Sequence, residues 1–194
     1  MFAWSLAVIV LVFLDQITKW LSVFFLQDHE PIRIIPWVLR LEFLPGGNKG
    51  AAWGMFADQR WIFITVSTVA IIGALVYIYL KRPKNKLLMA SLALIIAGGI
   101  GNMIDRVFIG SVIDFITFDF MDFPIFNGAD SFVCIGAAQN DAVDIRDEHL
   151  VADDGVSGLG KPPAKFFVQK IQIHSIRRLL GPWRSAAIIN GENG

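Results

Sequence analysis

Cysteine and histidine are scarce in this chain of 194 residues, which holds one cysteine and three histidines. The lone cysteine, Cys134, has no partner for an internal disulfide, so a disulfide-stapled fold is excluded. The histidines lie far apart in the sequence and do not have the ligand spacing of a zinc site. Acidic and basic residues are equal in number, and the resulting net charge of zero gives no reason to expect nucleic-acid binding.

Charge is scarce as well, but only in the first part of the chain. Residues 1–138 contain 20 charged side chains, whereas the 56 residues 139–194 contain 14. The whole chain is 55% hydrophobic and 18% charged, against about 45–50% and 25% in soluble domains. The composition therefore predicts two parts, a membrane domain at residues 1–138 and an atypical, poorly ordered polar tail at residues 139–194.

Three long apolar runs cover residues 1–26, 61–80 and 87–104. Each is close to the roughly 20 residues that span a bilayer, where only a helix satisfies its own backbone hydrogen bonds. Four basic residues between the second and third runs place that connection in the cytoplasm. Residues 27–60 then lie outside, and their alternating apolar residues predict short strands.

A fourth apolar run covers residues 126–138 and should cross back to the inner side. After Asp130 it continues for only eight residues, about 12 Å of helix. Asp141, Asp144 and later charges follow, and they are costly inside a bilayer. The predicted fold is mostly α, a polytopic membrane helical bundle with three clear transmembrane helices, a truncated fourth and a short β-rich periplasmic loop region. If the fourth run ends short of the inner headgroups, the tail stays outside.

Two aspartates in apolar surroundings, Asp114 and Asp130, form the main candidate site. The residues between them can turn back and bring the two carboxylates together near the outer face. Two adjacent carboxylates share one proton, so one can act as a general base on water and the other as a general acid. That division of roles suits peptide hydrolysis. Two interfacial aspartates without a joint role remain the alternative, and Asp119 and Asp122 are expected to be solvated loop charges.

Other polar residues inside or beside the apolar runs are functional candidates because they are costly there. Asp15 and Lys19 are four residues apart and can pair on one helix face, either to pack the first helix or to serve the chemistry. Asn102 and Asp105 share a face of the third run, and Arg106 can pair with a carboxylate. Asn48 lies among small residues that permit close backbone approach.

Five short motifs occur in order along residues 1–138. They are DQITK at 15–19, NKGAAW at 48–53, GNMIDR at 101–106, VIDF at 112–115 and FNGADS at 126–131. Together they resemble the bacterial lipoprotein signal peptidase family, also called signal peptidase II.

The resemblance implies an aspartic endopeptidase of the bacterial inner membrane, multi-pass, with its active site near the periplasmic face. Its substrate is a lipid-modified prolipoprotein, cleaved on the amino side of the diacylglyceryl-modified cysteine, and membrane lipid is a further partner. We expect a monomer, with no metal, no organic cofactor and no nucleic acid. Asp114 and Asp130 match the family's catalytic pair. The supporting or substrate-binding positions that match are Asp15, Lys19, Asn48, Asn102, Asp105, Arg106, Asn127 and Ala129.

The resemblance ends at Gln139, where family members continue the fourth helix with apolar residues. A changed reading frame or a fused foreign end would account for this departure, and so would an evolved extension. Two alternatives to an active peptidase stay open. One is an inactive or truncated remnant of the family, and the other is a non-enzymatic membrane protein whose carboxylates form an ion or proton site.

Overall fold

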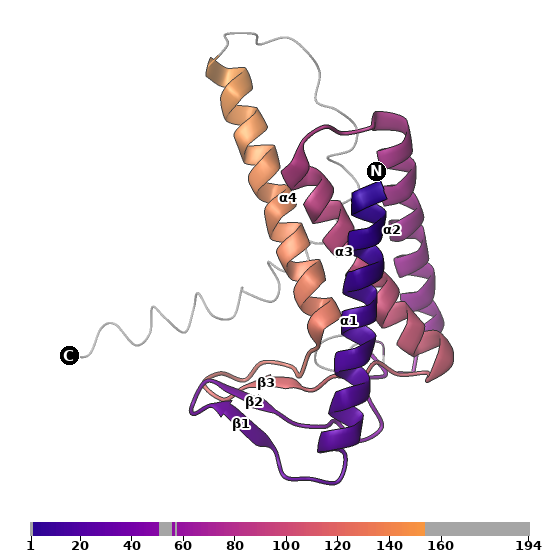
Figure 1. The fold of residues 1–194 in the computed structure, drawn as a ribbon, viewed down its shortest axis with the longest axis vertical. Coiled ribbons are helices and arrows are strands. Elements are labelled where there is room, and N and C mark those ends of the chain that lie inside the picture. Colours follow the sequence, from indigo (N-terminus) through magenta and orange to yellow (C-terminus); the bar gives the residue numbers. More distant parts are fainter. Residues whose placement is uncertain (1, 51–55, 57, 154–194) are drawn as a thin grey trace, which may run out of the picture. The chain divides into compact units, whose positions relative to one another are not determined.

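The computed structural model describes residues 2–50, 56 and 58–153, with side chains up to Val143. The chain divides into two units, Met1–Glu148 and His149–Gly194, and the fold below is that of the first. Its elements, labelled in Figure 1, are α1 (Phe2–Leu26), β1 (Ile32–Ile35), β2 (Leu39–Leu41), α2 (Arg60–Lys81), α3 (Lys86–Phe108), β3 (Ile116–Phe118) and α4 (Gly128–Asp153).

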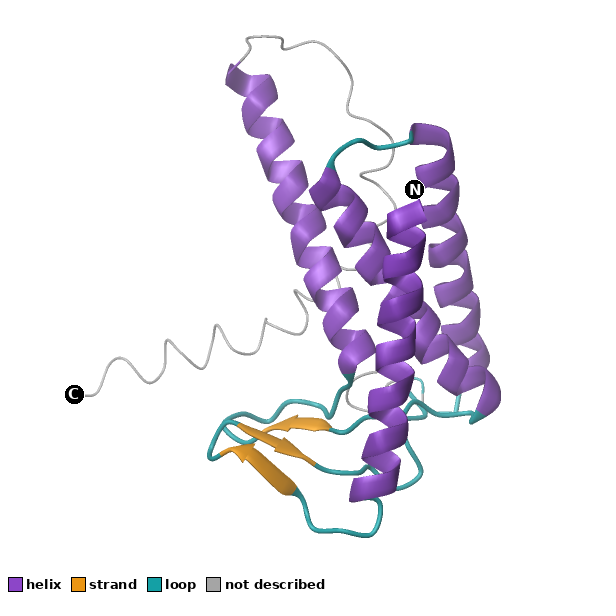
Figure 2. Ribbon diagram, in the orientation of Figure 1, coloured by secondary structure: helices purple, strands orange, loops and turns teal. Residues whose placement is uncertain are grey.

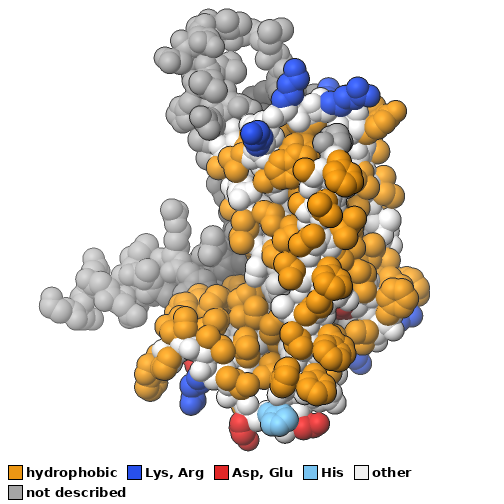
Figure 3. Space-filling view, viewed as in Figure 1, with side chains coloured by type: hydrophobic (Ala, Val, Ile, Leu, Met, Phe, Trp, Pro, Cys, Tyr) orange, Lys and Arg blue, Asp and Glu red, His pale blue; other side chains and the backbone are white. Residues whose placement is uncertain are grey.

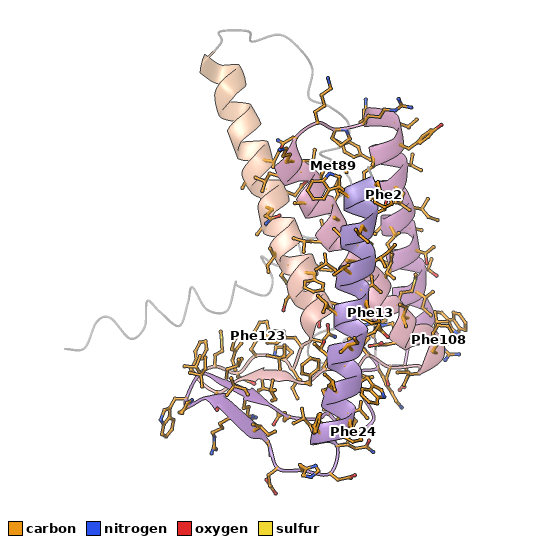
Figure 4. All side chains as sticks on the ribbon, in the orientation of Figure 1. Phe2, Phe13, Phe24, Met89, Phe108 and Phe123 are labelled. Atoms are coloured by element: carbon orange, nitrogen blue, oxygen red, sulfur yellow. The ribbon has the colours of Figure 1, made fainter. Side chains whose placement is uncertain are left out.

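Three of the described helices, α1, α2 and α3, are long and apolar enough to cross a membrane. Burial along α1 is the reverse of that in a soluble protein. Many of its large apolar side chains are exposed on the outside of the bundle, among them Phe2, Phe13 and Phe24, which are labelled in Figure 4. Its buried residues include Asp15 and Lys19. Apolar groups outside and polar groups inside suit a lipid surrounding, and the predicted bundle of three transmembrane helices is confirmed.

Helices α2 and α3 form a hairpin around the short basic connection. The Asn85 side chain caps α3 by accepting hydrogen bonds from two backbone N–H groups of its first turn. Ile78 of α2 packs with Met89, Leu92 and Ile96 of α3 to form the apolar core beside this end. Figure 3 shows Lys and Arg side chains gathered there, beyond an apolar surface that covers the helices. The basic end and the apolar belt agree with a cytoplasmic connection.

Helix α4 packs closely against α3 through small residues. A Cβ on Gly98 would overlap the carbonyl oxygen of Ala129, and one on Gly136 would come within 2.8 Å of the Ser91 carbonyl oxygen. The Ser91 hydroxyl donates to the Gly136 carbonyl oxygen at 2.8 Å. Helix α4 continues as far as Asp153, through the predicted boundary at residue 138. The division into domains stays a prediction, and residues 154–194 lie outside the described part.

A small antiparallel sheet lies at the end of the bundle where α3 ends, with strand order β1-β2-β3 (Figure 2). Leu41 of β2 pairs with Ile32 of β1 on one side and with Ile116 of β3 on the other. Strands were predicted within residues 27–60, and β1 and β2 confirm them. The third strand comes from the segment after α3, which gave no strand signal in the sequence.

The sheet carries a charged network that corrects one expectation. Asp119 was expected to be a solvated loop charge, but its carboxylate pairs with the Arg40 guanidinium at 2.9 Å. Arg40 also binds Glu42, whose carboxylate accepts a hydrogen bond from the Thr117 hydroxyl. Its hydrogen bond to Glu42, opposed by desolvation, raises the pKa of Arg40. The expectation was wrong because the partners of Asp119 lie far away in the sequence, namely Arg40 on β2 at 2.9 Å and Arg33 on β1 at 3.9 Å.

Candidate active site

Asp114 lies on a segment that is held on both sides by backbone hydrogen bonds. Two residues before it, Val112 exchanges N–H···O bonds with Asn48, at 2.7 and 2.9 Å. Immediately after it, Phe115 donates its N–H to the Phe126 carbonyl oxygen at 3.0 Å. The segment before α2 and the segment before α4 therefore both flank Asp114. This brings Asn48 and the start of α4 to one place, although they are far apart in the sequence.

Asp130 lies in the first turn of α4, where a capping arrangement holds it. The Asn127 side-chain oxygen accepts from the Asp130 backbone N–H at 3.0 Å. In return, the Asp130 carboxylate accepts from the Asn127 backbone N–H at 3.1 Å. This is the reciprocal pattern of a capping box, with asparagine at the cap and aspartate three residues later. The bonds that begin the helix thus also orient the Asp130 carboxylate.

Asn127 connects the two aspartates. Its side-chain amide donates to Asp114 Oδ1 at 2.6 Å, while its backbone N–H binds Asp130. Two more amides complete the set, because Asn48 donates to Asp114 Oδ2 at 2.9 Å and Asn102 donates to Asp130 Oδ1 at 2.7 Å. Each of the four carboxylate oxygens therefore accepts one N–H group. The two acids face one shared network, with no apolar side chain between Asn127 and either of them.

The two carboxyl groups differ in their surroundings. Asp114 is 2% exposed, whereas Asp130 is partly exposed. Burial raises the pKa of Asp114 to about 6, and the negative charge of Asp130 acts in the same direction. The hydrogen bonds from Asn48 and Asn127 oppose this rise because they favour the ionised form. Asp114 therefore keeps its proton to a higher pH than an ordinary aspartate does, up to a pH of about 6.

A buried ion cluster lies directly beside the two acids. Lys19 of α1 forms ion pairs of 2.9 Å with both Asp15 and Asp105, and its exposed fraction is 1%. The pair of Asp15 and Lys19 agrees with their spacing of four residues on α1. The pair of Lys19 and Asp105 joins α1 to α3, so this cluster also packs the first helix against its neighbour.

Arg106 extends from α3 toward the segment that carries Asn48. Its guanidinium donates to the carbonyl oxygens of Asn102 and Gly50, at 3.4 and 3.2 Å, and lies over the Phe63 ring at 4.6 Å. We expected Arg106 to pair with a carboxylate. In the described part of the chain it binds backbone oxygens instead, because Asp105 already pairs with Lys19. The described part of the chain does not include residues 51–55 and 57, which follow Gly50 in the sequence.

The structure brings together all ten residues predicted for the site, which come from the second half of α1, the last part of α3, the start of α4 and the segments that contain Asn48 and Asp114. Sequence reasoning missed Gln16, whose side-chain amide donates to Asp105 Oδ1 at 3.1 Å and to Asp15 Oδ2 at 3.2 Å. Its position between Asp15 and Lys19, in the polar interruption of an apolar run, was the available signal. Gln16 adds an uncharged donor to the ion cluster.

Comparison with known proteins decides the family. The sequence model described as Signal peptidase (SPase) II matches residues 7–140, well over half of the chain. The chain belongs to the signal peptidase II family. The lipoprotein signal peptidase of Halalkalibacterium halodurans is 41% identical over 142 residues, which cover 72% of this chain and 90% of that protein. The lipoprotein signal peptidase of Symbiobacterium thermophilum is 42% identical over 130 residues, covering 66% and 84%.

Solved structures agree with the assignment to signal peptidase II. A bacterial membrane enzyme determined by the in meso method at 2.3 Å resolution has a TM-score of 0.72 and 27% identity, covering 83% of this chain and 96% of that one. A second, at 1.9 Å resolution, has a TM-score of 0.69 and 30% identity, covering 76% and 95%. The match to the signal peptidase II model ends at residue 140, close to Gln139, where the sequence departs from the family pattern.

Proposed function

We propose that this chain is a membrane aspartic endopeptidase that removes signal peptides from prolipoproteins, cleaving on the amino side of a diacylglyceryl-modified cysteine. Membership of the signal peptidase II family supports the reaction and the lipoprotein substrate. The observation that carries the proposal for this chain is the position of Asn127, which donates hydrogen bonds to both Asp114 and Asp130. Asn127 thus holds both carboxylates next to one residue, as a pair of acids that shares a proton requires.

The surroundings of the two acids support a division of roles. Asp130 is partly exposed, so water can reach it, and we assign it as the general base that takes a proton from the attacking water. Asp114 is buried with its pKa raised to about 6, and we assign it as the general acid. It protonates the scissile carbonyl oxygen as the water oxygen adds to the carbon. The proton then held by Asp130 passes to the leaving amine. As the C–N bond breaks, Asp114 takes back a proton from one hydroxyl of the tetrahedral intermediate, so that the carbonyl of the new carboxyl group forms and both acids return to their starting states.

The proposed site lies near the periplasmic face of the inner membrane. The basic connection precedes α3 at Lys86, and the dyad network contacts α3 at Asn102, close to its other end. Because short basic loops stay in the cytoplasm, the dyad belongs on the opposite side. A substrate with two acyl chains can then remain in the bilayer while its peptide enters the site. The proposed site residues contact one another within a single copy of the chain, so the proposed site needs no residue from a second copy.

The test is cleavage of a purified, diacylglyceryl-modified prolipoprotein by the full chain in detergent or liposomes. We expect Asp114→Asn and Asp130→Asn each to lower the rate roughly 100-fold or more, because each removes one partner of the proton transfers. Asp122→Asn is the matched control, since Asp122 is an exposed aspartate between β3 and α4. It should cleave at the parent rate.

Thermal unfolding of each variant separates chemistry from folding. Cleavage that persists in either dyad variant removes that residue's proposed role. A folded parent chain that leaves the lipidated precursor intact supports the inactive-remnant alternative. A parent chain that cleaves, together with two inactive and well-folded dyad variants, excludes a site that only binds ions or protons.

A further inference from the structure

Lys19 is almost fully buried, and its ammonium group has three acceptors within 3.0 Å. These are Asp15 Oδ2 and Asp105 Oδ2, both at 2.9 Å, and Asn102 Oδ1 at 3.0 Å. An ammonium group has three N–H donors and no acceptor. Every donor of Lys19 therefore has a partner, and the side chain has one geometry available. Two of its partners are charged, but the third is the neutral amide that binds the dyad.

The two carboxylates around Lys19 reach the backbone directly before each proposed catalytic residue. Asp15 Oδ1 accepts from the backbone N–H of Ala129, the residue before Asp130, at 2.9 Å. Asp105 Oδ2 accepts from the backbone N–H of Ile113, the residue before Asp114, at 3.2 Å. One lysine thus holds both carboxylates that set the positions of the two acids.

The third partner sets the orientation of an amide. An asparagine side chain presents an acceptor on one side and donors on the other. Lys19 can only donate, and it shares the Asn102 oxygen with the Asn127 side-chain amide, which donates to it at 3.1 Å. These two donors hold the oxygen of Asn102 toward themselves, and the Asn102 Nδ2 group faces Asp130, to which it donates at 2.7 Å. A reversed amide would place donors together at Lys19 and two oxygens together at Asp130. Lys19 thereby helps to fix the donor that favours the ionised form of Asp130, and it is the charged member of the two groups that do so.

We propose that Lys19 is a positioning residue for the dyad, acting through Asn102 on Asp130 and through Asp15 and Asp105 on the backbone before each acid. The proposal rests on the proposed function. It goes beyond an ion pair that packs α1 against α3, because such a pair requires no contact with Asn102. Lys19 touches neither acid through a hydrogen bond, so its effect passes through its three partners.

The ionisable groups that face this arrangement come from every element packed around it. They are Asp15 on α1, Asp105 and Arg106 on α3, Asp114 before β3 and Asp130 on α4. Loss of Lys19 removes one of two cations from a group with four carboxylates. Both the lost charge and the freed Asn102 amide disfavour ionisation of the dyad. The dyad then binds protons more readily. As the pH falls, the variant therefore loses activity at a higher pH than the parent chain does.

The experiment measures kcat against pH for the parent chain and for Lys19→Met, Asn102→Leu and the double variant. We expect the acid limb of each variant to move to higher pH by about one unit, the size expected for one hydrogen bond to a charged group. If Lys19 acts through Asn102, the double variant shifts less than the sum of the two single shifts. Lys84→Met is the control, because Lys84 is an exposed lysine of the basic connection, and its profile should match the parent.

Several results would overturn the proposal. A merely structural lysine would lower the active fraction and reduce the rate equally at every pH, so an unmoved acid limb in folded Lys19→Met refutes the positioning role. If that variant does not fold, Asn102→Leu decides, because it leaves both ion pairs of Lys19 in place, and an unmoved limb there is equally fatal. If Asp114→Asn loses activity but the acid limb of Lys19→Met does not move, the positioning role of Lys19 is rejected and the proposed function stands. A parent chain without activity rejects the proposed function as well.

Discussion

At the scale of single residues, amides hold the two acids. Asn48, Asn102 and Asn127 supply side-chain N–H donors to the carboxylates. A lysine or arginine in those positions would favour two ionised carboxylates through its full charge. A neutral donor orients the carboxylate with a smaller effect on its protonation. In the proposed mechanism, neutral donors thus hold the dyad in place and favour loss of its proton less than cations would.

The pH dependence of the reaction tests this role for Asn48. In the proposed mechanism the alkaline limb of kcat/KM reports loss of the dyad proton, as the pH rises through the pKa of Asp114 near 6. The Asn48 donor favours ionised Asp114, so Asn48→Ala raises that pKa. The alkaline limb should move to higher pH by about half a unit to one unit. Asn85→Ala, which removes the cap of α3 at the other end, should leave the limb in place. A lower rate with an unmoved or lowered midpoint contradicts the role.

Local contacts around the site could be predicted from the sequence, but long-range ones could not. The pair of Asp15 and Lys19 follows from their spacing on one helix. Asn127 and Asp130 are three residues apart, which is the spacing of a capping box and a second local signal. By contrast, the contact of Lys19 with Asp105 depends on how α1 packs against α3. No spacing along the chain contains that information, and the resemblance to a family supplied only the residues.

At the scale of elements, small residues determine how closely α4 approaches α3. Gly98 and Gly136 allow backbone contact, and the Gly98 contact is with Ala129, the residue before Asp130. Any group that separates the helices at this point also moves the proposed base away from Asn102. Packing of the two helices and geometry of the site are therefore coupled at one glycine.

Two alanine substitutions test this coupling. In Gly98→Ala the new Cβ overlaps the Ala129 carbonyl oxygen, so α4 must shift. We expect a loss of roughly 1–3 kcal/mol in the free energy of unfolding, as for overpacking, together with slower cleavage. Gly73→Ala on α2 is the matched control, because a Cβ added at Gly73 would have no neighbouring atom within 4 Å. Alanine favours the helix there, so unfolding in detergent should cost the same or up to about 1 kcal/mol more. Equal stability of the two variants would show that the helices do not touch at Gly98.

The helices were predicted more fully than the sheet. Apolar runs of bilayer length predict α1, α2 and α3, because backbone N–H and C=O groups inside a bilayer have no water to bind and a helix pairs them within one segment. Helix α4 exceeds its apolar run, since its polar residues from Gln139 onward continue the helix without contributing apolar length. Strand β3 pairs with β2 across most of the chain, and its three residues carry too little pattern to identify it.

At the scale of the whole molecule, the alignment of α4 along α3 indicates on which side of the membrane α4 ends. The contacts of Gly98 with Ala129 and of Ser91 with Gly136 share one antiparallel register. Continued toward the start of α3, that register places Asp141 level with Lys86, beside the basic connection. The charged residues of α4 thus begin where the membrane-spanning part of α3 begins. This favours a complete crossing by α4, rather than a tail that stays outside.

Cysteine labelling tests the crossing. In a Cys134→Ser background, we expect Asp141→Cys to react with a membrane-impermeant maleimide in inverted inner-membrane vesicles but not in spheroplasts. Phe120→Cys, on an exposed site in the loop after β3, should show the opposite pattern. Reaction of Asp141→Cys from the outside would mean that α4 does not cross, and the register would then fail as a guide to topology.

The network around the two acids is complete by the first turn of α4, because Asp130 is its last member along the chain. The hydrogen bonds that hold the two acids consequently involve no residue after Asp130. A reporter protein or an affinity handle grafted onto α4 past Asp141 would disturb none of those bonds, which makes this position a practical attachment point for imaging or immobilising the enzyme.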